Sequence, residues 1–223
     1  MTASRLSIVV PVLQEVGEVG RFARHLAAVA PGVEVVLVDG GSTDGTVAAA
    51  RAAGLRVVED VGTGRALQMN AGASLVRGDH LLFLHVDTRP PPGVESLIAR
   101  ALADPEIVLG AFRFQVDDRT AAMRVIEWGC SLRNRLLGSP YGDQGLFLRR
   151  TDFERLGGFA DLELLEDMEF VDRAKAYGQV VVLDPPAVTS ARRYREKGVL
   201  RTWVRHLTLA TRFRLGWRPK VRS

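Results

Sequence analysis

Cysteine is almost absent from this 223-residue sequence, which contains a single one, Cys130. One cysteine excludes an intrachain disulfide and a metal site built from several thiolates, and it is typical of a reducing compartment. No uninterrupted apolar run approaches the ~18 residues of a membrane-spanning helix. The apolar run Leu6–Leu13 has no small-residue cleavage site after it, so it predicts a strand and not a signal peptide. We therefore expect a cytoplasmic protein.

Acidic residues are scarce at the C-terminal end. Residues 192–223 contain eleven Lys or Arg and one acid, Glu196, so their formal charge is +10. The formal net charge of the whole sequence is only +4. The remaining 191 residues sum to −6. This basic segment has no interleaved aromatic platform and no known nucleic-acid-reading motif, so we do not expect a nucleic-acid partner.

Hydrophobic periodicity predicts alternating strands and helices in the first half of the chain. The expected strands are Leu6–Leu13, Val33–Val38, Leu55–Val58 and Leu81–Val86. The expected helices are Val16–Ala30, a helix from Thr43 or Asp44 to Ala53, and Arg65–Val76. Repeats of this length imply right-handed crossovers and a mostly parallel sheet with helices on both faces, a Rossmann-like α/β sandwich.

The second half is less regular. It predicts strands at Ile107–Val116 and Val180–Leu183, the latter stopped by Pro185 and Pro186. It also predicts helices at Ala121–Leu137, Glu166–Tyr177 and Val199–Leu215. No repeat or clear linker divides the chain, so we expect one domain.

Polar residues follow the ends of two predicted strands. Ligands of parallel sheets bind beyond the carboxyl ends of the strands, so Asp39, His85 and Asp87 should face one crevice. A desolvated carboxylate needs a partner. Asp87 therefore either binds a divalent cation such as Mg²⁺ or Mn²⁺, or caps its loop through backbone amides near Arg89.

Two further segments carry candidate chemistry. Arg65 follows a glycine loop at a helix start, a position that favours phosphate. In the helix from Glu166, spacing places Asp167 on the inward stripe with Phe170, and Glu166 on the outer stripe with Arg173. The alternative is that these acids only favour the helix dipole.

Four motifs in order resemble family 2 glycosyltransferases of the GT-A fold over about Leu6 to Leu183. They are VPVLQE at 10–15, VDGGSTDGT at 38–46, GD at 78–79 leading to FLHVDT at 83–88, and GGF at 157–159 followed by ED at 166–167. GRALQMN at 64–70, FLH at 83–85 and SARRY at 190–194 further resemble the bacterial subgroup associated with arsenosugar biosynthesis.

The resemblance implies that a sugar passes, with inversion, from a nucleotide-diphosphate donor to an acceptor hydroxyl. The donor is UDP-linked by default, with GDP as the alternative. Pro11, Glu15 and Asp39 would hold the nucleoside, Asp87 would bind Mg²⁺ or Mn²⁺ on the diphosphate, and Asp167 would be the general base. Residues 1–191 would form the catalytic domain, and residues 192–223 a helical extension packed on it.

The sequence departs from the family pattern at His85, where the family commonly has the first Asp of its metal motif. A neutral imidazole still binds metal or contacts ribose, but the site loses one negative charge. On the acceptor side the candidates are Asp143, Gln144 and Glu166, with loop capping an equal alternative for the first two.

The basic C-terminal segment has two expected roles. Arg192 and Arg193 would fold over the diphosphate, and residues 199–214 either pack on the body or contact the inner face of an anionic membrane. Two other functions stay open. A non-catalytic nucleotide-sugar binder is compatible with His85, and a nucleotidyltransferase would want a longer glycine-rich loop after the first strand.

Overall fold

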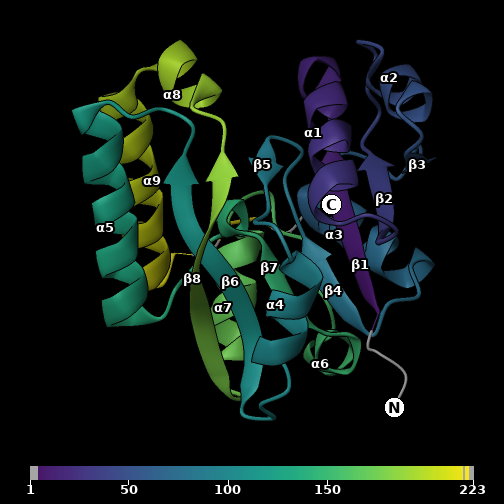
Figure 1. The fold of residues 1–223 in the computed structure, drawn as a ribbon. Coiled ribbons are helices and arrows are strands. Elements are labelled where there is room, and N and C mark those ends of the chain that lie inside the picture. The colour runs from purple at the N-terminus through teal and green to yellow at the C-terminus, as the bar shows by residue number, and fades with distance from the viewer. Residues whose placement is uncertain (1–4, 218, 221–223) are drawn as a thin grey trace.

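The computed structural model describes residues 5–217 and 219–220, except for the side chains of Arg193, Lys197, Val199, Leu200, Thr202, Trp203 and 205–207. One eight-stranded sheet runs through the protein in the order β3-β2-β1-β4-β7-β6-β8-β5 (Figure 1). Its strands are β1 (Leu6–Val12), β2 (Glu34–Asp39), β3 (Arg56–Val58), β4 (His80–Phe83), β5 (Thr88–Arg89), β6 (Ile107–Val116), β7 (Leu146–Arg149) and β8 (Gln179–Thr189).

The helices cover both faces of this sheet. They are α1 (Val16–Val29), α2 (Thr46–Ala52), α3 (Arg65–Leu75), α4 (Val94–Ala101), α5 (Ala121–Leu137), α6 (Arg150–Leu156), α7 (Glu166–Ala174), α8 (Arg192–Lys197) and α9 (Val199–Arg214), with a 3₁₀ turn, η1, at Gly142–Gln144.

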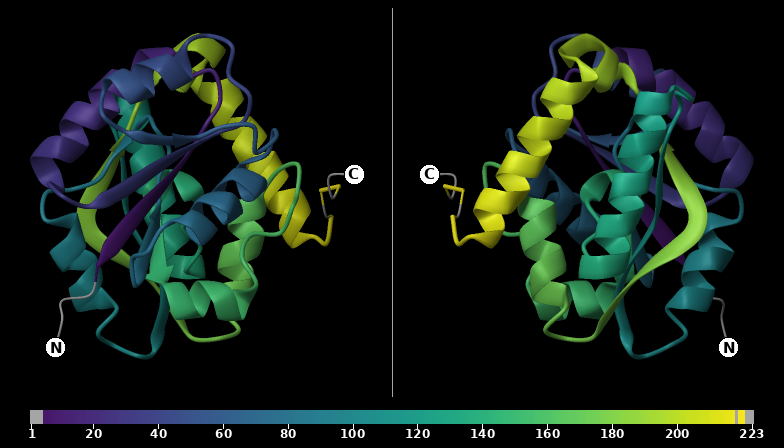
Figure 2. Two further views of the ribbon diagram at one scale, coloured as in Figure 1. Left: turned by 90° about the vertical axis from the view of Figure 1, so that its right-hand side faces the viewer. Right: turned by 90° about the vertical axis from the view of Figure 1, so that its left-hand side faces the viewer.

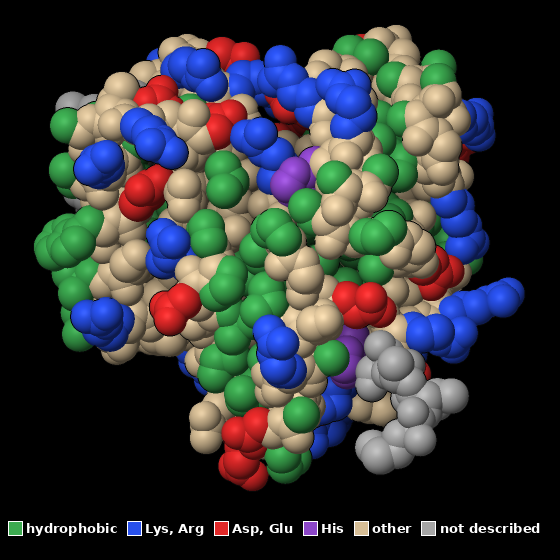
Figure 3. Space-filling model, in the orientation of Figure 1, with side chains coloured by type: hydrophobic (Ala, Val, Ile, Leu, Met, Phe, Trp, Pro, Cys, Tyr) green, Lys and Arg blue, Asp and Glu red, His purple; other side chains and the backbone are tan. Residues whose placement is uncertain are grey.

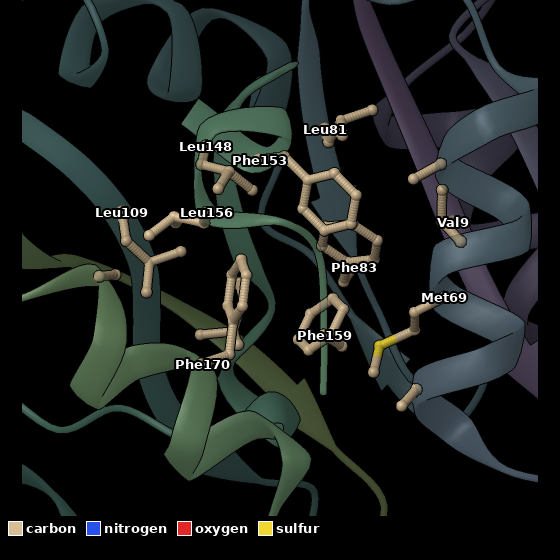
Figure 4. Close-up of a cluster of buried hydrophobic side chains, with 14 of the residues drawn as sticks. Val9, Met69, Leu81, Phe83, Leu109, Leu148, Phe153, Leu156, Phe159 and Phe170 are labelled. Carbon is tan, nitrogen blue, oxygen red and sulfur yellow. The ribbon is translucent and has the colours of Figure 1, made fainter. Parts of the chain in front are cut away.

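Side chains alternate between the two faces of the sheet along each strand, so each face has its own hydrophobic core. Ile8 and Val10 of β1 pack with α1, α2 and α4 on one face, whereas Val9 packs with α3, α6 and α7 on the other. The second core is rich in phenylalanine, and the Phe159 and Phe170 rings lie 4.3 Å apart (Figure 4). The expected three-layer sandwich is therefore confirmed.

The strands at the centre of the sheet do not all run in one direction. The pairs β1–β2, β2–β3, β1–β4 and β6–β8 are parallel, but β7 is antiparallel to both β4 and β6. An antiparallel strand begins at the edge where its parallel neighbours end. Consequently η1, which precedes β7, lies beside the residues that follow β4.

Two predicted strand ends are wrong. The expected strand Leu81–Val86 stops at Phe83, so His85 and Asp87 lie in a buried loop beyond β4. Pro185 and Pro186 do not stop β8, which continues to Thr189. The register shifts here between Phe112 and Arg113, and an irregularity of this kind tolerates prolines that cannot donate to the ladder.

The C-terminal helix lies against the body. Ala210 and Phe213 of α9 are buried and contact Met168 of α7, while α9 also lies beside α5 (Figure 2). The main chain adds a further contact, since Glu163 N donates to Lys220 O at 3.1 Å. No helix in the described part of the chain is long and apolar enough to cross a membrane.

Candidate active site

The carboxyl ends of β1 and β2 form one wall of the site. Asp39 is the last residue of β2 and pairs in register with Val12 of β1, one residue after Pro11. Its Oδ2 accepts hydrogen bonds of 2.8 Å from the amides of Gly41 and Ser42. Its buried Oδ1 has no hydrogen-bond partner among the described residues. Asp39 thus presents one unused acceptor at this edge.

A buried glutamine of α3 holds together the two strand ends that form this wall. Gln68 Nε2 donates to the carbonyls of both Val12 and Val38 at 2.8 Å, so it joins the ends of β1 and β2. The loop that precedes α3 approaches the same strand ends, because the Cβ position of Gly40 lies 3.4 Å from Gly62 O. Arg65, the first residue of α3, is thereby held near the end of β2.

The C-terminal segment reaches the same wall near the end of β1. Arg192, at the start of α8, forms an ion pair with Glu15, which directly precedes α1. This hydrogen bond raises the pKa of Arg192 above its usual value, and Asp87 adds to the effect through its charge. Glu15, Arg192 and Asp87 are therefore neighbours. The side chain of Arg193 lies outside the described residues.

Asp87 is nearly buried, as a metal or phosphate site requires. The exposed fraction of the residue is 7%, and Oδ1 accepts a long hydrogen bond of 3.4 Å from Thr88 Oγ1. Its main-chain carbonyl accepts from Ser190 N at 3.0 Å, which anchors the start of the C-terminal segment to the loop after β4.

Asp167 is held by two backbone amides. Gly142 N donates to its Oδ2 at 2.7 Å and Met168 N donates to its Oδ1 at 2.8 Å. A Cβ built on Gly142 would lie 3.2 Å from Asp167 Oδ2 and 3.4 Å from His85 Nε2. Gly142 therefore occupies the space between these two side chains, and the absence of a Cβ leaves that space narrow and polar.

Asp143 is the buried carboxylate at the centre of the site. Burial raises its pKa to about 6; Arg133 opposes this shift, while Asp167 and Asp87 reinforce it. Its Oδ1 lacks a hydrogen-bond partner among the described residues. Asp143 directly follows Gly142, which donates to Asp167 and lies beside His85, so segments from distant parts of the sequence meet around η1.

Arg65 and Glu166 form an ion pair, with 2.9 Å between Nε and Oε1. The expectation that Glu166 lies on the outer stripe of α7 is wrong, because its side chain is 4% exposed whereas Asp167 is partly buried. Helix α7 begins immediately after Leu165, which has a positive φ of 64°. Glu166 is the first residue of the helix, so its ion pair with Arg65 orients the first turn. One edge of the Arg65 guanidinium is therefore already paired with the Glu166 carboxylate.

Of the two roles expected for Gln144, its contacts favour stabilisation of its own loop. It is fully buried, its Oε1 accepts from Tyr141 N and Arg133 Nη2, and its Nε2 donates to Phe112 O at 2.9 Å. Both polar atoms of its side chain are hydrogen-bonded within the protein, so Gln144 supports η1.

Sequence analysis missed Arg133 and Tyr141. The Arg133 guanidinium lies 3.6 Å from the centroid of the Tyr141 ring and is the cation that partly offsets the burial of Asp143. Its signal was present in the sequence, since Arg133 shares the inward stripe of α5 with Ile126 and Cys130. An arginine on an apolar stripe indicates a buried anionic partner.

The carboxylate oxygens of this site suit a hard divalent cation. Within the described residues no group of three or more His, Cys, Asp or Glu side chains is arranged to enclose a metal. Mg²⁺ is commonly held by one or two carboxylates together with substrate phosphates, so Asp87 and His85 fit that role without a third protein ligand.

The raised pKa of Asp143 predicts a pH-dependent cost to stability. Its carboxyl ionises near pH 3.8 when unfolded and near 6 when folded, so the folded state holds the proton more tightly and stability falls as pH rises between these values. We expect Asp143→Asn to remove this loss. The melting temperature of Asp143→Asn minus that of wild type should therefore increase by about 5 °C from pH 4 to pH 7. Thermal unfolding in EDTA measures this difference.

Asp118→Asn is the matched control for this measurement. Hydrogen bonds from Thr120 lower the pKa of Asp118, so its charged form stabilises the fold and its Asn variant should gain nothing as pH rises. Equal pH trends for Asp143→Asn and wild type would show that Asp143 is ionised without penalty.

The family model for glycosyl transferase family 2 matches residues 7–159. This match covers more than half of the chain, and the protein therefore belongs to glycosyl transferase family 2. No curated protein matches the sequence.

Solved structures share the fold at low sequence identity. A mannosyltransferase from Pyrobaculum calidifontis in complex with GDP-Man and Mn²⁺ is similar with a TM-score of 0.64 and 22% identity, over 98% of this chain and 67% of that one. Glucosyl-3-phosphoglycerate synthase from Mycobacterium tuberculosis, in complex with Mn²⁺, UDP and phosphoglyceric acid, gives 0.58 and 18%, over 81% and 68%. The same synthase with Mg²⁺ and UDP gives 0.57 and 20%, over 82% and 70%. The GT-A fold is confirmed.

Proposed function

We propose that this protein is an inverting glycosyltransferase that moves a sugar from a nucleotide-diphosphate donor to an acceptor hydroxyl. One observation carries the proposal: Gly142 lies between Asp167 Oδ2 and His85 Nε2, so Asp167 of α7 lies beside the loop after β4 that carries Asp87, 80 residues earlier in the chain. Family membership supports a nucleotide-sugar donor, and the arginines beside these acids supply the charge that a diphosphate needs.

The donor would lie along the edge formed by β1, β2 and β4. The free Oδ1 of Asp39 is an acceptor for an N–H of the nucleotide base, with Pro11 and Glu15 beside it. Asp87 and His85 would hold a Mg²⁺ or Mn²⁺ ion, which neutralises charge on the diphosphate as the nucleotide leaves. Arg65, Arg192 and Arg193 would contact the phosphate oxygens. We propose UDP as the nucleotide, with GDP as the alternative.

Asp167 would accept the proton of the acceptor hydroxyl. Its two backbone hydrogen bonds fix the carboxylate while leaving lone pairs on both oxygens. Inversion in one displacement needs a base on the face of the sugar opposite the leaving group, and no covalent carboxylate nucleophile. Asp143 and Glu166 border the same space, and they would shape the acceptor side together with Gly142.

The subgroup associated with arsenosugar biosynthesis is the proposed position within the family. Two residues of its GRALQMN motif have defined structural roles, because Gln68 joins β1 to β2 and Asn70 Nδ2 donates to Phe159 O at 2.8 Å. The motif therefore fixes the shape of the donor wall, and it leaves the acceptor unspecified.

We further propose a cytoplasmic location at the inner face of the membrane, with residues 199–214 near the lipid. The exposed side chains of Arg201 and Arg212 on α9 support a contact with anionic headgroups. The contacts of Ala210 and Phe213 with α7 use the opposite face of the helix.

Donor binding tests the proposed function directly. UDP-glucose or GDP-mannose with Mn²⁺ should raise the melting temperature, because a ligand at 100 times its Kd stabilises by about 2.7 kcal/mol. Slow release of the free nucleoside diphosphate should accompany binding. Binding without any release or transfer would indicate the non-catalytic binder, and release of pyrophosphate from a nucleoside triphosphate would indicate a nucleotidyltransferase.

A further inference from the structure

The outward face of α5 is apolar along its length. Val125, Trp128, Leu132 and Leu136 recur at helical spacing and are 64%, 67%, 39% and 70% exposed. They form a stripe roughly 17 Å long at 1.5 Å per residue, which we call the α5 stripe. A contiguous exposed set of large apolar side chains indicates a contact surface, whereas single exposed leucines do not.

Basic side chains border this stripe. On α5 itself, Arg124 and Arg135 are exposed along one flank. Helix α9 lies beside α5, and both helices face the viewer in the right-hand view of Figure 2. Exposed arginines of α9 therefore extend the basic border on the same side of the protein. In Figure 3, hydrophobic side chains project over α5 at the left edge, with Lys and Arg side chains among them.

Helices α5 and α9 contain almost no acid to balance their arginines. The segments of α5 and α9 include a single acidic residue, Glu127. Its Oε1 accepts a hydrogen bond from Val116 N at 2.8 Å, so it is directed toward β6 and away from the border. The charge of this face is therefore positive around an apolar centre.

Tryptophan is also concentrated here. The sequence contains three tryptophans, and all of them, Trp128, Trp203 and Trp217, lie in α5 or in the C-terminal segment. Trp217 is 37% exposed, and the guanidinium of Arg212 lies 5.2 Å from its ring. Exposed tryptophan next to arginine is typical of side chains at the boundary between lipid headgroups and acyl chains.

We infer that the α5 stripe inserts into the surface of an anionic membrane, with the arginines of α5 and α9 on the headgroups. A second copy of this chain is a poorer occupant, because a twofold contact through this face would bring arginines of both copies together without acids between them. The inference deepens the membrane contact proposed for residues 199–214, and it does not depend on the transfer reaction.

The position of α5 gives this contact a consequence for the site. The inward face of the same helix carries Arg133, which contacts Tyr141 and Gln144 next to η1. A membrane held against the outer face of α5 therefore lies one helix diameter, about 10 Å, from residues beside the acceptor side. This arrangement favours an acceptor hydroxyl that belongs to a lipid or lies at the lipid surface.

Vesicle binding tests the inference. The full chain should sediment with phosphatidylglycerol/phosphatidylcholine vesicles, at least about tenfold more tightly than with pure phosphatidylcholine, and 0.5 M NaCl should weaken this binding. Tryptophan fluorescence should shift to the blue on binding. The double variant Trp128→Ser/Leu132→Ser should lose at least about tenfold in affinity, and Arg124→Gln/Arg135→Gln should lose less but reduce the salt dependence.

Matched variants on other faces separate the stripe from general effects. Leu75→Ser at the end of α3 removes a leucine with the same 39% exposure as Leu132, and Arg100→Gln removes an exposed arginine of α4. Both should bind as wild type does. Far-ultraviolet circular dichroism and melting temperature check that the stripe variants fold.

Equal binding to both vesicle types, or unchanged binding of the folded stripe variant, would overturn the inference. A concentration-dependent dimer that dissociates in Trp128→Ser/Leu132→Ser would also overturn it, since a second copy would then cover the stripe. Failure of vesicle binding with intact donor turnover would leave the proposed reaction in place.

Discussion

Asp167→Asn should reduce kcat by about 10²–10⁴ while the affinity for the donor stays close to that of wild type. The amide cannot accept the proton of the acceptor hydroxyl, and a positioned general base contributes about that factor to the rate. The donor site is expected to survive, because Asn retains an Oδ atom that can accept from Gly142 N. Initial rates of transfer, together with titration of UDP-glucose or GDP-mannose, measure the two effects separately.

Asp172→Asn provides the matched control for this variant. Asp172 lies on the same helix, α7, its side chain is 45% exposed, and it pairs with Lys175 on the surface. Its removal should leave kcat within about twofold of wild type, because an exposed ion pair contributes little. Wild-type turnover of Asp167→Asn would assign the base to another residue, of which Asp143 is the first to test.

Asp87→Asn should abolish the dependence of donor binding on Mn²⁺ or Mg²⁺ and weaken that binding by at least about tenfold. Removing the carboxylate takes the anionic ligand out of the proposed metal site, and an uncharged amide oxygen is a weaker ligand for a hard cation. Isothermal titration with donor, in the presence of Mn²⁺ and again in EDTA, measures the change. Transfer should fall by a further factor, because charge on the departing diphosphate is then unscreened.

Asp79, at the other end of β4, provides the matched control. It precedes β4 as Asp87 follows it, and its Oδ2 accepts from Arg5 N at the opposite edge of the sheet. Asp79→Asn should preserve the metal dependence of donor binding even if it lowers stability. Metal-dependent donor binding in Asp87→Asn that equals wild type would place the cation elsewhere.

The parallel half of the fold was predictable because its signals are local. Apolar runs of four to eight residues, separated by helical spacing and glycine, fix β1, β2, β3 and the helices between them. The second half depends on contacts that the sequence does not display. Leu146–Arg149 is too short to show a period, and it becomes the central strand β7 only because β4 and β6 pair with it.

The candidate site shows the same division. Strand ends identified Asp39 and Asp87, and a family motif identified Asp167, but spacing alone gave the wrong orientation for Glu166. At the first turn of a helix an ion pair such as that with Arg65 decides the direction of a side chain, and helical periodicity does not contain that information. Asp143 could be marked in the sequence only as a candidate between glycines. Its raised pKa reflects burial together with the charges of Arg133, Asp167, Asp87 and Arg65, which come from other segments.

The antiparallel strand in the middle of the sheet also constrains how the chain matures during synthesis. β4 obtains its second neighbour only when residues 146–149 have left the ribosome, so until then its hydrogen-bonding edge is open to solvent and to other chains. The N-terminal half consequently cannot become a finished unit on its own. The two halves of the chain would gain their final stability in one cooperative step, and a nascent chain that stalls before β7 would be a target for chaperones or proteases.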